Sequence, residues 1–137
     1  MQTSVYVPAT GRVSVWAARV ITAVVVVFLL FDGIIHLTKP QPVVDAFAQL
    51  GYPLAASRGI GIVELLCLGV YLVPRTALLG AVLLTALLGG AMSAHVRAGS
   101  PFFETYVFPV LVAALIWGGL LVRDERLRGL FPVRRVP

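Results

Sequence analysis

Four long apolar segments, separated by short polar or proline-containing stretches, dominate this chain of 137 residues. They run from about Val15 to Leu37, Ser57 to Val73, Thr76 to Ala94 and Tyr106 to Val122. Each is close to the roughly 20 residues that an α-helix needs to cross the hydrocarbon core of a bilayer. A lone strand would leave its backbone groups unsatisfied in lipid, so even the valine-rich first segment is predicted to be helical. We therefore expect an all-α integral membrane protein, a four-helix bundle over residues 15–122.

The composition excludes an ordinary soluble domain. Hydrophobic residues make up 59% of the chain and charged residues only 12%, whereas about a quarter of the residues of a soluble domain are charged. The net charge of +5 is explained by basic residues that flank membrane spans, so we expect the lipid bilayer and no nucleic acid as a partner. Cys67 is the single cysteine, which excludes an internal disulfide and a CxxC redox motif.

The distribution of basic residues predicts an orientation in the membrane. Four spans put both termini on one side, and only Lys39, Arg58 and Arg97 of the 11 basic residues fall on the other side. The excess at the termini predicts that both face the cytoplasm, in the inner (plasma) membrane. Residues 1–14 would be a cytoplasmic N-terminal segment, and residues 123–137 a basic cytoplasmic tail in contact with anionic lipid.

The connecting segments are also informative. Between the first two spans, Val43, Val44, Phe47 and Leu50 fall on one helical face, opposite Asp45 and Gln49. This pattern predicts a short interfacial helix of one or two turns over the mouth of the bundle. The turn Val73–Thr76 is short enough to force the second and third spans into an antiparallel hairpin. Small residues four apart in the third span, such as Ala77 and Ala81, favour close helix packing within the bundle.

Ionisable residues inside spans are costly, and this chain places several at similar depth. Asp32 and His36 are four residues apart near the outward end of the first helix, so they share one face. Glu64 lies seven residues into the second helix, about 10 Å below the outer boundary, which is also the expected depth of Asp32. His95 ends the third helix on the same side. We therefore predict a polar cavity in the outward half, with an apolar floor beneath it.

A pair of carboxyls beside an imidazole suits acid/base chemistry, because one group can donate a proton while its neighbour accepts one. We expect the catalytic residues to be Asp32, Glu64 and His36. The expected substrate-binding residues are Arg58, His95, Tyr52, Tyr71 and Trp117. The alternative is that the same polar residues pair only to fix the register of the helices.

A metal site could use the same acidic and histidine side chains. However, the chain has no second clustered ligand pair such as HExxH. We therefore expect no metal ion and no other cofactor.

Four stretches of the sequence together resemble the DoxX-like family of small four-helix membrane proteins. They are FDGIIHLTKP, a loop that ends in LGYP, SRGIGIVELLCLGVYLVPRT and AHVRAGSP. The resemblance covers about Phe28 to Arg128. It includes an RxxGxxE motif formed by Arg58 and Glu64.

The resemblance implies a four-helix bundle and leaves two functions open. Some members are linked to membrane redox modules, including a thiosulfate:quinone oxidoreductase subunit. The fold is also similar to that of EXPERA-group sterol isomerases and receptors, which bind or protonate a lipophilic ligand. We thus expect a site for a small lipophilic molecule, with isomerase, cyclase or epoxide-opening chemistry. The alternatives are a non-catalytic subunit of a quinone-linked redox complex and a purely structural bundle, and the chain could also form a homo-oligomer.

Overall fold

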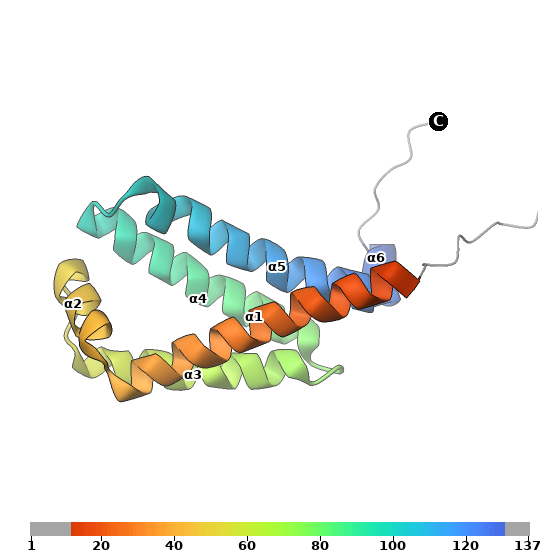
Figure 1. The fold of residues 1–137 in the computed structure, drawn as a ribbon, viewed down its shortest axis with the longest axis horizontal. Coiled ribbons are helices and arrows are strands. Elements are labelled where there is room, and N and C mark those ends of the chain that lie inside the picture. The colour runs from red at the N-terminus through yellow and green to blue at the C-terminus, as the bar shows by residue number, and fades with distance from the viewer. Residues whose placement is uncertain (1–11, 131–137) are drawn as a thin grey trace, which may run out of the picture.

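The computed structural model describes residues 12–130 and is helical almost throughout (Figure 1). Its elements are α1 (Arg12–Thr38), α2 (Gln41–Leu50), α3 (Ala55–Leu72), α4 (Ala77–Ala98), the π-helical turn η1 (Phe103–Val107), α5 (Phe108–Arg123) and α6 (Glu125–Leu130). The described residues contain no strand. The prediction of an all-α fold is therefore confirmed.

Four helical segments are long and apolar enough to cross a membrane. They are Val15–Thr38, Ala55–Leu72, Ala77–Ala98 and Phe103–Arg123. Each coincides with one of the apolar segments of the sequence, and the ends differ by a few residues. The four predicted spans are confirmed.

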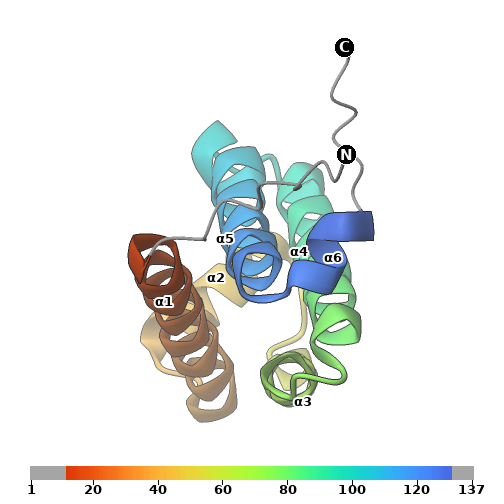
Figure 2. The ribbon, with the colours of Figure 1, turned by 90° about the vertical axis from the view of Figure 1, so that its right-hand side faces the viewer.

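The four spans form a ring when viewed along the bundle (Figure 2). α1 packs against α3 and α5, and α4 packs against the same two helices. The buried core includes Leu29 of α1, Leu68 of α3, Leu84 of α4 and Ile116 of α5. Large apolar side chains, among them Leu66 and Val110, are exposed on the outside, as expected for helices that meet lipid on one face and protein on the other.

Two glycines allow neighbouring helices to approach backbone to backbone. A Cβ atom at Gly61 of α3 would lie 2.7 Å from the main-chain oxygen of Gly33 in α1. A Cβ at Gly80 of α4 would collide with the backbone of Tyr71 in α3. Ala77 and Ala81 are buried beside Gly80, so these small residues of the third span serve packing within the bundle.

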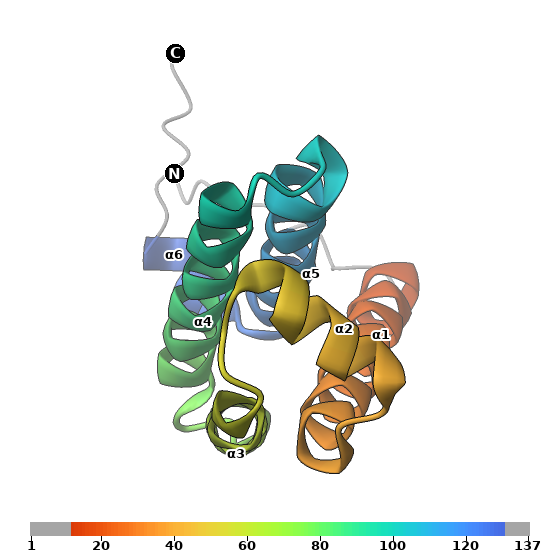
Figure 3. The ribbon, with the colours of Figure 1, turned by 90° about the vertical axis from the view of Figure 1, so that its left-hand side faces the viewer.

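α2 lies across one end of the bundle (Figure 3). Pro40 precedes the helix, and Gly51 ends it with a φ of 68°, a left-handed conformation that glycine adopts without strain. Val43 and Phe47 are buried, whereas Asp45 and Gln49 are exposed, as the helical pattern predicted. With 10 residues the helix is longer than the predicted one or two turns. Its position at a membrane interface stays a prediction.

A tight turn joins α3 and α4, as predicted. The turn contains Pro74, which has no N–H to continue α3. The Thr76 hydroxyl donates to the main-chain oxygen of Val70 at 2.9 Å and so satisfies one of the last carbonyls of α3.

The turn η1 begins the fourth span as a π-helix because of Pro109. The proline nitrogen has no hydrogen for the usual bond to residue 105. Instead, the N–H of Phe108 reaches back five residues to the oxygen of Phe103, which widens the turn. The Thr105 hydroxyl ties this turn to the preceding loop by donating to the Pro101 oxygen at 2.9 Å.

Basic residues lie at both ends of the bundle. The end covered by α2, called the α2 end below, carries Lys39, Arg58 and Arg97. The opposite end, where α1 begins and α5 ends, is called the terminal end and carries Arg19, Arg75, Arg123 and Arg126 (Figure 1). Residues 1–11 of the predicted N-terminal segment and 131–137 of the predicted tail lie outside the described residues. Which end faces the cytoplasm stays a prediction.

Candidate functional site

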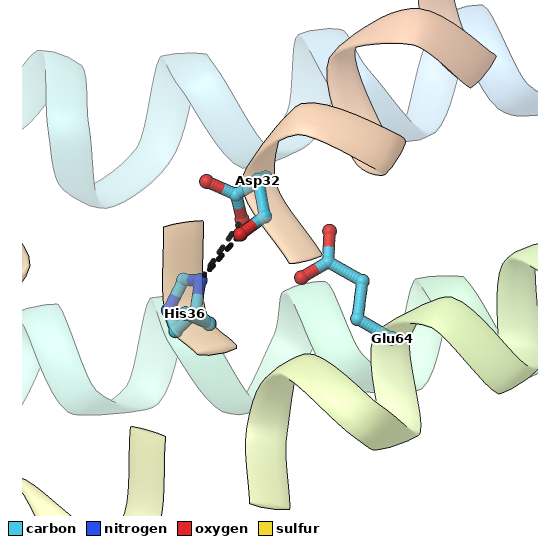
Figure 4. A group of neighbouring side chains, drawn as sticks. All are labelled: Asp32, His36 and Glu64. Carbon is cyan, nitrogen blue, oxygen red and sulfur yellow. Dashed lines mark hydrogen bonds and ion pairs between the residues drawn. The ribbon is translucent and has the colours of Figure 1, made fainter. Parts of the chain in front are cut away.

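Asp32 and His36 of α1 meet Glu64 of α3 in one group near the α2 end (Figure 4). One ligand atom from each side chain lies within 4.8 Å of the other two. Asp32 and Glu64, which were predicted to lie at the same depth, are thus direct neighbours in the structure. This set of three residues is called the acid–imidazole group below.

The His36 ring has a defined orientation. Its Nδ1 donates to the main-chain oxygen of Asp32 at 2.9 Å and lies 3.8 Å from Asp32 Oδ2. In a neutral imidazole this bond places the hydrogen on Nδ1 and leaves Nε2 as an acceptor. The other side of the ring meets Phe47 of α2 edge to face, with 5.9 Å between ring centroids. α2 therefore contacts the group through Phe47.

The two carboxyls have different surroundings. Glu64 is 3% exposed, whereas the Asp32 side chain is 34% exposed and the His36 side chain 18%. Figure 4 shows the Glu64 carboxyl directed toward Asp32, between α1 and α3. Asp32 is therefore the more accessible carboxyl, and Glu64 is the buried one behind it.

Close contact between α1 and α3 produces this geometry. Gly33 follows Asp32 and Gly61 lies one turn before Glu64, and a Cβ atom at Gly61 would be 2.9 Å from the His36 Cβ. The buried Ser57 hydroxyl donates to the main-chain oxygen of His36 at 2.8 Å. Ser57, Gly33 and Gly61 were not predicted from the sequence to shape the site. The signal for Ser57 and Gly61 is their spacing with Glu64, which places all three on one face of α3; Gly33 had no such signal.

The other charged residues predicted for the site lie outside the acid–imidazole group. Arg58 is exposed on α3, next to the buried Ser57. His95 lies on α4, the helix diagonally opposite α1, and its Nδ1 is 3.0 Å from the Ser100 hydroxyl. His95 therefore helps to connect α4 to the loop before η1.

The three predicted aromatic residues occupy different places. Tyr52 is exposed at the α2 end, and the Arg97 guanidinium lies 4.7 Å from its ring centroid. Tyr71 is seven residues beyond Glu64, about 10 Å along α3, and donates to the Ile116 oxygen at 2.9 Å. Trp117 donates to the Thr85 hydroxyl at 2.9 Å. The half of the bundle toward the terminal end thus contains hydrogen-bonded polar side chains, where we expected a plain apolar floor.

The acid–imidazole group has two chemical capacities. Two carboxyls and an imidazole can take up, hold and release a proton. The same donor set of two carboxylate oxygens and one imidazole nitrogen is also one that divalent transition metals accept.

The fold and this group define a small multi-pass membrane protein of four helices with a polar centre in the bundle. The sequence profile of the DoxX-like family matches residues 20–119, a range that contains all three residues of the group. The chain therefore belongs to the DoxX-like family, as the resemblance in its sequence predicted. No curated protein and no solved structure is detectably similar to the chain.

Proposed function

We propose that the protein binds a small lipophilic molecule beside Asp32, His36 and Glu64 and transfers protons to and from it. One observation carries the proposal: two carboxyls and an imidazole from adjacent membrane-spanning helices come within 4.8 Å of one another. Inserting an ionisable side chain at the centre of a membrane span costs about 3 kcal/mol on insertion scales. Such side chains are therefore rare in spans and mark functional sites.

The different exposure of the three side chains suggests separate roles. Asp32, the most exposed, contacts the ligand and exchanges a proton with it. Glu64 lies behind Asp32 and provides the second carboxyl, so that one carboxyl is protonated while the other is ionised. The hydrogen bond to the Asp32 main-chain oxygen fixes the His36 ring, so that Nε2 is offered as a further proton acceptor.

Such a site suits reactions that add a proton at one atom of a substrate and remove one from another. The shift of a carbon–carbon double bond has this balance, since one proton enters and one leaves without an oxidant or reductant. Acid-catalysed cyclisation and epoxide opening begin with the same protonation. Residues Arg58, Tyr71 and Trp117 are not needed in this scheme.

The first prediction concerns the two carboxyls. The full-length protein, purified in mild detergent, is incubated in D2O with the lipids that co-purify with it, and deuterium uptake is followed by mass spectrometry. We expect the wild type to deuterate a lipophilic compound and Asp32→Asn and Glu64→Gln to lose at least about 100-fold in rate, as for removal of a general acid or base. Asp45→Asn, an exposed acid of α2, is the matched control and should behave as the wild type.

Three results would contradict the proposal. If the folded carboxyl variants deuterate the lipophilic compound as fast as the wild type, the carboxyls have only a structural role. A stoichiometric divalent metal that Glu64→Gln removes would replace proton transfer with a metal site. A co-purifying redox protein, retained equally by both carboxyl variants, would favour the non-catalytic subunit of a quinone-linked complex.

A further inference from the structure

A groove of about 630 Å³ opens at the terminal end, away from the acid–imidazole group. It is lined by one face of α1 from Val15 to Val26, by Leu72 of α3, by Val122 and Arg123 of α5, and by Glu125 of α6. Figure 2 looks onto this end, where α1 and α5 lie side by side. The lining is called the terminal groove below. Its volume falls within the range of about 300–1,000 Å³ found for small-molecule sites.

The terminal groove is polar near the boundary of the hydrocarbon core and apolar deeper in the membrane. Arg123 is the last residue of its span, and Arg19 lies one turn inside the first span, which begins at Val15. Both guanidinium groups can therefore reach the boundary of the hydrocarbon core, where long basic side chains place their charge. Ala23 and Val26 line the deeper part, about 10 Å further along α1 at Val26. An occupant that matches this lining has an anionic head and an apolar body.

Each of the two arginines lies over an aromatic ring. Arg123 Nη2 donates to the main-chain oxygen of Tyr71 at 3.1 Å, and its guanidinium lies 4.7 Å from the Tyr71 ring centroid. The Arg19 guanidinium lies 5.8 Å from the Trp16 ring centroid. A guanidinium group presents a planar set of N–H donors, which matches phosphate oxygens better than a lysine ammonium does.

The charge balance favours a singly charged anion. Two arginines and the single carboxylate of Glu125 line the terminal groove, so the lining carries one excess positive charge. A phosphodiester carries one negative charge and neutralises it. Basic pockets between membrane helices are also the places where lipid phosphate groups bind.

We propose that the terminal groove is a binding site for an anionic phospholipid. The phosphodiester lies against Arg19 and Arg123, and an acyl chain follows the face of α1 along Ala23 and Val26. A free phosphate shares the chemistry of the head but makes no use of the apolar lining. The site is independent of the acid–imidazole group and of the chemistry proposed there.

The second prediction tests this site by native mass spectrometry of the full-length protein in neutral detergent, titrated with phosphatidylglycerol. We expect one lipid to remain bound, and Arg19→Gln to weaken its binding about tenfold, the effect of losing one charge-assisted contact. Arg75→Gln is the matched control, because Arg75 is an exposed arginine at the same end that does not line the groove. Ala23→Leu should also displace the lipid by filling the apolar part, whereas Ala17→Leu, an exposed residue of α1 outside the lining, should not.

Competition with glycerol phosphate separates a lipid from a soluble anion. Failure of millimolar glycerol phosphate to displace the lipid would support the proposal. Equal displacement by glycerol phosphate and by phosphatidylglycerol would overturn it in favour of a free anion. An equal loss of lipid affinity in Arg19→Gln and Arg75→Gln would overturn it in favour of general attraction between charges. Unchanged lipid binding by Ala23→Leu would show that no acyl chain occupies the groove.

Discussion

At the scale of single residues, the absence of a side chain matters as much as the presence of the charged ones. Gly61 allows α3 to touch the backbone of α1 at Gly33, and this contact brings Glu64 to Asp32. The depth of the two carboxyls could be predicted from the sequence, because it depends only on the rise of a helix per residue. Their direct approach could not, because helix rotation and separation depend on which glycines meet across the interface.

The third prediction follows from this contact. Gly61→Ala places a Cβ atom 2.7 Å from a backbone oxygen and should destabilise the bundle by about 1–3 kcal/mol, a typical cost of overpacking. Gly69→Ala, in the same helix with nothing within 4 Å of the new Cβ, should stabilise it by about 0.5–1 kcal/mol because alanine is the better helix former. The midpoint of thermal unfolding in detergent, read from labelling of the buried Cys67 thiol, measures both effects. A neutral Gly61→Ala would show that α1 and α3 are not in backbone contact.

At the scale of elements, α2 is the connection that contacts the site, through Phe47 and His36. Its apolar face was predictable from the spacing of Val43 and Phe47, since both positions follow the helical period. Its length was underestimated, because the prolines at 40 and 42 mark the start of a helix as readily as they break one. The contact between Phe47 and His36 was not predictable, since it depends on how α2 folds back over α1.

The fourth prediction concerns this contact. Phe47→Ala removes a buried aromatic ring from the underside of α2, a change that costs about 3–5 kcal/mol in protein cores. We expect amide hydrogen exchange over residues 41–50 to become at least about 100-fold faster, while exchange in the spans stays unchanged. Phe31→Ala is the control, because Phe31 is exposed on the outer face of α1. Unchanged exchange in α2 of the Phe47→Ala variant would mean that other contacts hold the helix in place.

At the scale of the whole molecule, the four apolar segments were sufficient to predict the bundle, because lipid leaves helices as the only solution for separate spans. The order of helices around the ring was not predictable from the segments alone. The terminal groove depends on that order, since Arg19 and Arg123 share it only because α1 lies beside α5. From the sequence, the basic residues of this end were interpreted as signals of orientation and, in the tail, as contacts with anionic lipid, and no groove between α1 and α5 was predicted.

The fifth prediction tests that orientation. Single cysteines are introduced at Gln49 on the exposed face of α2 and at Val73 in the turn after α3, in a Cys67→Ala background. The excess of basic residues at the terminal end predicts that an impermeant maleimide labels position 49 from outside intact cells. Position 73 should be labelled only after the membrane is opened. The opposite pattern would place the termini outside the cell.

Tyr71 contacts the backbone of α4 at Gly80, donates its hydroxyl to Ile116 of α5 and lies beneath the guanidinium of Arg123. During synthesis α3 emerges from the ribosome well before α5. Until α5 has entered the membrane, the Tyr71 hydroxyl lacks the carbonyl that accepts its hydrogen, and an unpaired polar group in lipid is unfavourable. Insertion of the last span therefore supplies the main-chain acceptor at Ile116 that the Tyr71 hydroxyl of the second span uses in the complete bundle.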